Sequence, residues 1–273
     1  MSLKQSETPS VTPSKAVSRV AVVTHGKADR IGDALGRLRS VAERCGVSLV
    51  DDADAELAVV LGGDGTMLRA LQRFLGTPVA SLGVNFGRVG FLTSIAATEL
   101  EAGLEQAFAG GYEMRELPTI EADCEGGLVN GINDVVLSSG ILGRMVILEW
   151  SVEGVSMGEL GCDGAILATP TGSTAYNLSA GGPVLAWGTD AFVVSFVSPH
   201  SLHARSMVLG RSHVVELRNA TVDVPLQVIV DGHGQGTIDP GGAVTVRMSD
   251  RSARLARLPG TSFFSRYRDT FSH

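Results

Sequence analysis

Lysine is scarce in this chain of 273 residues, where it is found only at Lys4, Lys15 and Lys27. None of the three follows a glycine-rich turn, so the chain lacks the G-x-x-x-x-G-K-[ST] loop in which a lysine binds nucleotide phosphates. A formal net charge of -7 also opposes binding to nucleic acid or to anionic membranes. We therefore expect small molecules as partners, no nucleic acid and no membrane, and any bound phosphate must be held by backbone, arginine or metal.

Cysteine is rare as well, and long apolar runs are missing. Cys45, Cys124 and Cys162 are an odd number of thiols without a C-x-x-C pair, which predicts buried free cysteines instead of disulfides or a zinc site. No apolar run approaches the roughly 18 residues of a membrane span, and the first residues lack the pattern of a signal peptide. These absences predict a cytoplasmic protein.

The chain is 44% apolar and 19% charged, which is typical of a compact globular protein. Residues 1–16, rich in Ser, Thr and Pro, are predicted to form a disordered tail. Residues 17–120 alternate apolar strands with helices, which predicts an α/β domain with a parallel sheet. Residues 121–250 are β-rich and predict an all-β, sandwich-like second domain. We expect residues 251–273 to pack back on the α/β domain, with a short closing helix.

The first domain shows its elements most clearly. Apolar runs at 19–25, 56–61 and 78–85 predict buried strands, because parallel strands covered on both faces are apolar throughout. Apolar residues at helical spacing predict helices over 29–45 and 66–75. The order of these elements is that of an open α/β sheet.

Three glycines surround a single carboxylate in "LGGDGTML", residues 61–68. Asp64 follows a buried strand and precedes a helix, so it lies at the carboxyl end of the sheet, where α/β proteins bind ligands. The glycines can adopt positive φ and allow the backbone to approach a phosphate closely. The loop therefore predicts a phosphate site. Taken alone, it is equally consistent with an ordinary turn in which Asp64 caps the helix.

A second pattern supports the phosphate interpretation. The block "DGAILATPTGSTAYNLSAGGP" covers 163–183, "GVNFGRVGFLT" covers 83–93, and "NDVVL" covers 133–137. Together with the loop at 61–68, these motifs closely resemble the NAD kinase family. They occur in that family's order and extend over most of residues 17–273.

The resemblance implies an α/β domain followed by a β-sandwich domain. It implies an enzyme that transfers the γ-phosphate of ATP, or a phosphate of polyphosphate, to the 2'-hydroxyl of the adenosine ribose of NAD, giving NADP. It also implies Mg²⁺ or another divalent metal ion, and assembly as a homodimer or homotetramer. The metal ligands are not assigned.

The resemblance also implies roles for individual residues. Asp64 matches the catalytic aspartate, and Gly62, Gly63, Gly65 and Thr66 match the phosphate loop. The implied NAD-binding residues are Asn133 and Asp134 at the ribose and adenine end, Thr171, Thr174, Ala175 and Tyr176 along the adenine, and Asp163 and Ser179 near the nicotinamide half, in part reached from a neighbouring subunit.

Other positions are less clearly assigned. Arg88, between Gly87 and Gly90, is a secondary candidate for the ATP site because its loop should open into the same crevice. Arg205 and His233 lie in segments that depart from the family's pattern, so their roles stay open. Arg205 could clamp a phosphate or form an ordinary surface ion pair.

Residue chemistry alone leaves alternatives. Without the resemblance, Asn133 and Asp134 are more typical of a turn, and Tyr176 of a core aromatic. Two rival functions are a lipid kinase that shares the glycine loop and a non-catalytic dinucleotide-binding sensor. The acidic charge disfavours the lipid kinase and the retained Asp64 disfavours the sensor. Because a helix N-terminus favours the ionised carboxylate, we expect a lowered pKa for Asp64, which would make it a weak base that mainly orients the hydroxyl.

Overall fold

The computed structural model describes residues 12–13, 15–24, 31–87, 90–124, 126–260 and 262–271. The chain divides into two compact units. Unit 1 contains Met1–Leu117 and Ala253–His273, and unit 2 contains Pro118–Ser252.

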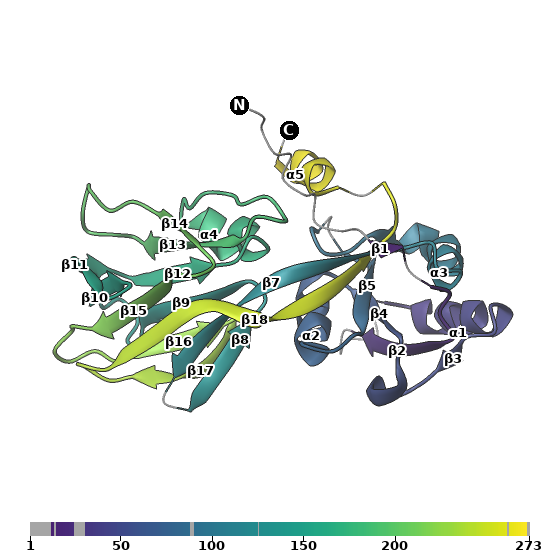
Figure 1. Cartoon of the computed structure of the whole chain (residues 1–273), viewed down its shortest axis with the longest axis horizontal. Coiled ribbons are helices and arrows are strands. Elements are labelled where there is room, and N and C mark those ends of the chain that lie inside the picture. Colours follow the sequence, from purple (N-terminus) through teal and green to yellow (C-terminus); the bar gives the residue numbers. More distant parts are fainter. Residues whose placement is uncertain are drawn as a thin grey trace. The chain divides into compact units, whose positions relative to one another are not determined.

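A parallel sheet lies at the centre of unit 1 (Figure 1). Its strands are β2 (Arg19–Thr24), β3 (Ser48–Leu49), β4 (Leu57–Gly62), β5 (Ala80–Asn85) and β6 (Ile95–Ala96). β4 lies between β2 and β5, and the end of β18 (Ala243–Arg257) pairs in parallel with β5. Every residue of β4 is buried, as its apolar run predicts. The predicted parallel sheet is confirmed, although the short β1 (Thr12–Pro13) adds an antiparallel pairing with β7 (Glu113–Cys124).

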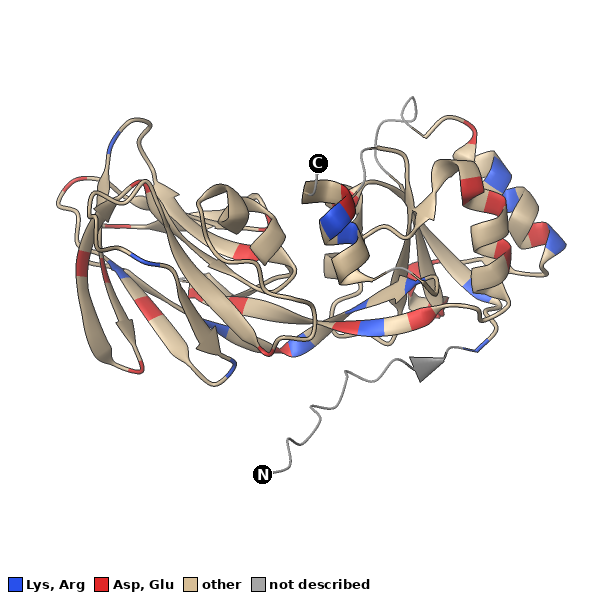
Figure 2. Cartoon of the chain, turned by 90° about the horizontal axis from the view of Figure 1, so that it is seen from above, with Lys and Arg blue, Asp and Glu red and all other residues tan. Residues whose placement is uncertain are grey.

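The helices of unit 1 cover this sheet, with α2 on one side of β4 and β5 and α1 and α3 on the other in Figure 1. These helices are α1 (Ala34–Arg44), α2 (Asp64–Arg73) and α3 (Leu100–Phe108), with 3-10 turns at Asp52–Asp54 and Ala97–Glu99. A further helix of unit 1, α5 (Phe263–Phe271), contacts Phe91 and Thr93 instead. Two ion pairs, Arg37 with Glu101 and Arg44 with Glu105, join α1 to α3. Both basic and acidic positions are marked on helices of this unit in Figure 2.

Unit 2 is an antiparallel β-sandwich, as predicted. One sheet has the order β14-β13-β12-β9-β16-β17. Its strands are β9 (Asp134–Ser139), β12 (Gly164–Ala168), β13 (Ala191–Val197), β14 (Met207–Gly210), β16 (Leu226–Val230) and β17 (His233–Ile238). Facing it are β10 (Val146–Val152), β11 (Val155–Cys162), β15 (Val214–Asn219) and the first part of β18, while β8 (Gly127–Gly131) pairs with β7. Alternate side chains of both sheets fill one core, including Leu137, Phe192 and Leu217.

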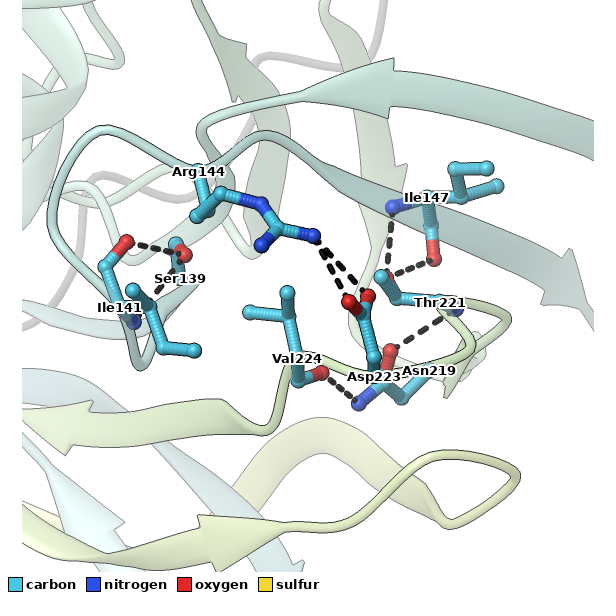
Figure 3. A network of polar contacts seen from close by, with 8 residues as sticks. All are labelled: Ser139, Ile141, Arg144, Ile147, Asn219, Thr221, Asp223 and Val224. Atoms are coloured by element: carbon cyan, nitrogen blue, oxygen red, sulfur yellow. Dashed lines mark hydrogen bonds and ion pairs between the residues drawn. The ribbon is translucent and has the colours of Figure 1, made fainter.

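A buried asparagine organises the turn between β15 and β16 (Figure 3). The Nδ2 of Asn219 donates hydrogen bonds to the carbonyl oxygens of Val224, at 2.9 Å, and Ile238, at 3.1 Å. Next to it, Arg144 forms an ion pair with Asp223 at 2.9 Å. This network ties the turn to the segment that precedes β10.

The cysteines are free, but the prediction that all three are buried is wrong. Only Cys162 is buried, where burial raises the pKa of its thiol to about 11. Cys124 is half-buried, and Cys45 is exposed because it caps the solvent-facing C-terminal end of α1. Among the described residues, no helix is long and apolar enough to cross a membrane.

Candidate active site

The carboxylate of Asp64 is fixed by backbone groups. Asp64 is the first residue of α2. Its Oδ2 accepts a hydrogen bond from the N–H of Phe91 at 2.7 Å, and its Oδ1 accepts one from the N–H of Leu92 at 3.1 Å. A Cβ atom at Gly90 would lie 2.2 Å from Oδ1, so any side chain there would displace the carboxylate. Asp64 and residues 90–93, which we call the amide segment, therefore fix each other in place.

Burial dominates the ionisation of Asp64. It raises the pKa of this carboxyl above its ordinary value, although the hydrogen bonds from Phe91 and Leu92 and the charge of Arg266 act in the opposite direction. The expectation of a lowered pKa is therefore wrong, because the desolvation of a half-buried carboxylate outweighs the stabilisation of its ionised form. A raised pKa makes Asp64 a stronger proton acceptor than the sequence indicated.

The glycines of the loop do not adopt the positive φ that the sequence allows for them. None of Gly62, Gly63 and Gly65 has a positive φ. Gly62 is required because a Cβ atom there would lie 2.3 Å from the Oγ1 of the buried Thr66. A Cβ atom at Gly63 or Gly65 would meet nothing within 4 Å, so these two positions leave the backbone at the start of α2 uncovered. Arg88 lies outside the described residues.

Unit 2 brings Asn133, Asp134 and Thr171 to one end of its six-stranded sheet. Asp134 at the start of β9 pairs with Ala168 at the end of β12, while β16 ends beside β9. The N–H of Thr169 donates to the carbonyl oxygen of Asn133 at 2.9 Å. A Cβ atom at Gly172 would lie 2.0 Å from that same oxygen, so only glycine allows the two segments to pack this closely.

Two polar atoms at this end of the sheet are buried and unsatisfied within the described structure. They are the Oδ1 of Asn133 and the Oγ1 of Thr171. An unsatisfied buried polar group costs about 1–3 kcal/mol, which a ligand can recover by hydrogen bonding to it. An Asx turn would use the Oδ1 of Asn133 as an acceptor, so the turn interpretation does not describe this residue.

Sequence reasoning missed Asp231, which follows β16 with a φ of 49°. Its carboxylate accepts hydrogen bonds from the N–H groups of Ile132, at 2.8 Å, and Asn133, at 2.7 Å. Burial, with the charge of Asp231 nearby, raises the pKa of Asp134 to about 7. The Asp-Gly step in "VDGHG" was the available signal, because it marks a turn directly after a buried strand.

The block at 163–183 folds into two short helical turns after β12. These are η4 (Gly172–Thr174) and α4 (Tyr176–Ser179). Thr174 and Ala175 are half-buried, whereas Tyr176 is 45% exposed and does not fill the core. The ring of Tyr176 is therefore available to a ligand.

Asn177 braces this block and was also missed. It is fully buried, and its Nδ2 donates to the carbonyl oxygens of Ser173, at 3.1 Å, and Pro183, at 3.0 Å. Its Oδ1 accepts from the hydroxyl of Ser195 at 2.7 Å. An asparagine inside a motif rich in small residues gave no sign of this structural role.

Asp163 and Ser179 are both exposed. Asp163 directly precedes β12, whereas Thr169 directly follows it, so the two ends of the strand are roughly 20 Å apart at about 3.3 Å per residue. One chain therefore does not bring Asp163 to Asn133 and Asp134.

Three further observations concern the remaining candidates. Arg205 donates to the carbonyl oxygens of Leu202 and Ala204 in its own loop. His233 is exposed, with its Nδ1 at 2.9 Å from the carbonyl oxygen of Asp231. Within the described part of the chain, no group of three or more His, Cys, Asp or Glu side chains could hold a metal ion.

Comparisons with known proteins match both units to the same family. Residues 6–112 match the family model of the ATP-NAD kinase N-terminal domain, and residues 132–258 match that of the C-terminal domain. The NAD kinase of Symbiobacterium thermophilum is 39% identical over 224 residues, covering 80% of this chain and 79% of that protein. The NAD kinase of Gemmatimonas aurantiaca is 37% identical over 229 residues, covering 82% and 79%.

Solved structures share the fold. A crystal structure of an NAD kinase from Archaeoglobus fulgidus in complex with ATP has a TM-score of 0.75 and 27% identity, covering 93% of this chain and 97% of that one. Yeast NADH kinase complexed with NADH has a TM-score of 0.79 at 20% identity, covering 94% and 88%, and shows likeness of fold alone.

The raised pKa of Asp134 predicts a pH-dependent gain in stability for Asp134→Asn. A carboxyl whose folded-state pKa is about 7 lowers the free energy of unfolding progressively as the pH rises from the unfolded-state pKa of about 3.9 to about 7, because over that range the unfolded chain is ionised and the folded chain is protonated. The substitution should raise the Tm at pH 8 by roughly 2–4 °C for each kcal/mol that it adds to the free energy of unfolding. The increase should be much smaller at pH 5. Thermal melts at both pH values measure this, with the exposed Asp163→Asn as control. An equal Tm difference at both pH values would contradict the prediction.

Proposed function

We propose how this chain, which belongs to the NAD kinase family and phosphorylates NAD to NADP, divides that reaction between its two units. Unit 1 supplies the catalytic carboxylate and binds the donor phosphates. Unit 2 binds the adenosine half of NAD. The observation that carries this proposal is the half-buried carboxylate of Asp64, fixed by two backbone N–H groups at the start of α2.

ATP is the proposed phosphoryl donor. The structural relative from Archaeoglobus fulgidus is in complex with ATP, which supports this choice. The uncovered backbone at Gly63 and Gly65 and the positive end of the α2 dipole suit a phosphate group. Polyphosphate also carries a terminal phosphoryl group joined by a phosphoanhydride bond, and it is the alternative donor. We retain Arg88 as a candidate for neutralising the donor's charge.

Mg²⁺ or a similar divalent ion is proposed to arrive with the donor. Mg²⁺ is commonly held by one or two carboxylates together with substrate phosphates, so a cluster of several protein ligands is not required. In unit 1, the donor phosphates at the proposed phosphate loop would hold the ion, which leaves the Asp64 carboxylate available as proton acceptor. When bound, the ion neutralises charge on the phosphoryl group during transfer.

The acceptor nucleoside is proposed to bind where the buried polar atoms of unit 2 are unsatisfied. The Oδ1 of Asn133 can accept from a ribose hydroxyl, and the Oγ1 of Thr171 can donate or accept. Asp134 would fix which of the two vicinal hydroxyls is presented. The exposed ring of Tyr176 would stack on the adenine, with Thr174 and Ala175 beside it.

In the proposed reaction, Asp64 orients the 2'-hydroxyl of the ribose and accepts its proton. The 2'-oxygen forms a bond to the γ-phosphorus of ATP as the bond from that phosphorus to the β,γ-bridging oxygen breaks, so ADP leaves. The transition state is loose, and the proton is therefore transferred late. A pKa raised by burial suits this role better than the lowered value expected from the helix end.

The two rival functions are less well supported. Positions of Lys or Arg and positions of Asp or Glu are interspersed along the backbone in Figure 2, whereas a lipid kinase would present a basic or apolar face to the membrane. A non-catalytic sensor would have no need of the buried Asp64.

A homodimer or homotetramer is proposed from exposed apolar side chains in unit 2. Leu142 and Leu202 are 103% and 90% exposed, and Met145 is 40% exposed. Met145 and His200 both lie beside Gly161, so the loops that carry Leu142 and Leu202 are neighbours, and a continuous apolar surface is typical of one that a partner covers. The exposed Asp163 would then act on the nicotinamide half of NAD bound by a neighbouring copy.

Asp64→Asn should lower kcat by at least the ~100-fold typical of the loss of a general base, while NAD affinity changes little. The amide keeps one acceptor, but its NH₂ group opposes one of the two N–H donors of the amide segment. Thermal melts must therefore show that the variant is folded. Steady-state NADP formation and calorimetric NAD binding measure the two effects. If the variant kept more than about a tenth of wild-type kcat, Asp134 would replace Asp64 as the candidate.

Specific activity should fall when the protein is diluted below its association range, because the proposed site is completed by a second copy. Leu142→Arg should shift the oligomer to monomer and reduce activity at concentrations where wild type is assembled. Light scattering and NADP formation on the same samples measure this, with Leu128→Arg, at an exposed position of β8, as control. Full specific activity in a demonstrated monomer would disprove the shared site.

A further inference from the structure

The amide segment that holds Asp64 is itself held by the C-terminal helix. The ring of Phe91 lies 5.9 Å from that of Phe263 and 5.8 Å from that of Phe271, measured between centroids. The Nη2 of Arg266 donates a hydrogen bond of 2.7 Å to the carbonyl oxygen of Thr93. The Asp64 carboxylate therefore binds the N–H groups of Phe91 and Leu92, while α5 contacts the ring of Phe91 and the carbonyl oxygen of Thr93.

Helix α5 is built to present these groups. Its first turn is capped reciprocally: the N–H of Ser265 donates to the hydroxyl of Ser262 and the N–H of Ser262 to that of Ser265, each at 3.0 Å. Phe263, Tyr267 and Phe271 follow at four-residue spacing, with centroids 6.3 Å and 5.1 Å apart, and form one aromatic row. Two members of this row contact Phe91.

We propose that α5 is a positioning element for the catalytic carboxylate, acting through Arg266 and Phe271 on the amide segment. This inference rests on the proposed catalytic role of Asp64. A displacement of about 1 Å at a reacting group can cost as much as 100-fold in rate. Changes in α5 should therefore lower kcat while leaving the binding of NAD, which is assigned to unit 2, nearly unchanged.

Arg266 adds an electrostatic link to the same carboxylate. Phe91, Leu92 and Thr93, which face Asp64 from the amide segment, are uncharged, and the charge of Arg266 lowers the pKa of Asp64 against the effect of burial. The Nε of Arg266 is buried without a hydrogen-bond partner among the described residues. The unsatisfied Nε offsets part of the stabilisation that the hydrogen bond from Nη2 to Thr93 provides.

The first test compares three variants of the full chain. Arg266→Met removes the charge and the hydrogen bond to Thr93, and Arg266→Lys retains a positive donor. Arg268→Met, at a side chain that is 71% exposed and paired with Asp269 next to it, is the matched control. Steady-state NADP formation is measured over a range of pH, with melting temperatures to establish folding.

Arg266→Met should lower kcat between about 10-fold and 100-fold and change the KM for NAD by less than about threefold. The acid limb of the kcat profile should move to higher pH, because loss of the positive charge raises the pKa of Asp64. The lysine variant should recover most of both effects, and the control should match wild type. An unchanged kcat, or an unchanged acid limb, in a folded Arg266→Met variant would overturn the proposal.

A double-mutant cycle separates this proposal from a general structural effect. If α5 acts through Asp64, then Arg266→Met should cause little further loss in the Asp64→Asn background, where residual NADP is measured by an enzymatic cycling assay. Equal fold losses in both backgrounds would reject the link through Asp64 and leave the proposed function intact. High activity in Asp64→Asn alone would reject the role of Asp64, and this proposal with it.

Discussion

The hydrogen bonds between the Asp64 carboxylate and the N–H groups of Phe91 and Leu92 are the constraint on which the chemistry of unit 1 depends. They join the start of α2 to two residues that lie 27 and 28 positions further along the chain. They also explain the glycine at position 90, where a side chain would occupy the space of the carboxylate. A carboxylate held on both oxygens has little freedom to turn. The conformational entropy of orienting it is therefore lost during folding and not during the reaction.

The two units meet different chemical demands. Unit 1 needs a place where negative charge is tolerated, which the start of a helix with uncovered glycines supplies. For unit 2 we propose recognition of a nucleoside by polar groups at the end of one sheet, where Asp231 orders the backbone of residues 132–134. Both sites contain a half-buried aspartate that accepts hydrogen bonds from backbone N–H groups and thereby orders a loop.

Much of this could be predicted from the sequence, because the relevant signals are local. The fully apolar β4 indicates a covered parallel strand, and the glycines around Asp64 indicate a loop at its end. The direction of the Asp64 pKa could not be predicted, since it depends on burial by a segment distant in the sequence. The roles of Asp231 and Asn177 were missed for the same reason: each acts by hydrogen bonds to other strands or turns that only the folded chain brings close.

The most direct test of this account is the pKa of Asp64 itself. The ¹³C chemical shift of its carboxyl carbon can be followed by NMR over a pH titration, with the signal assigned by its loss in Asp64→Asn. The account predicts a midpoint above the ordinary value of about 3.9. A midpoint at or below that value would show that the helix end and the backbone hydrogen bonds outweigh burial, and would contradict the role of Asp64 as proton acceptor.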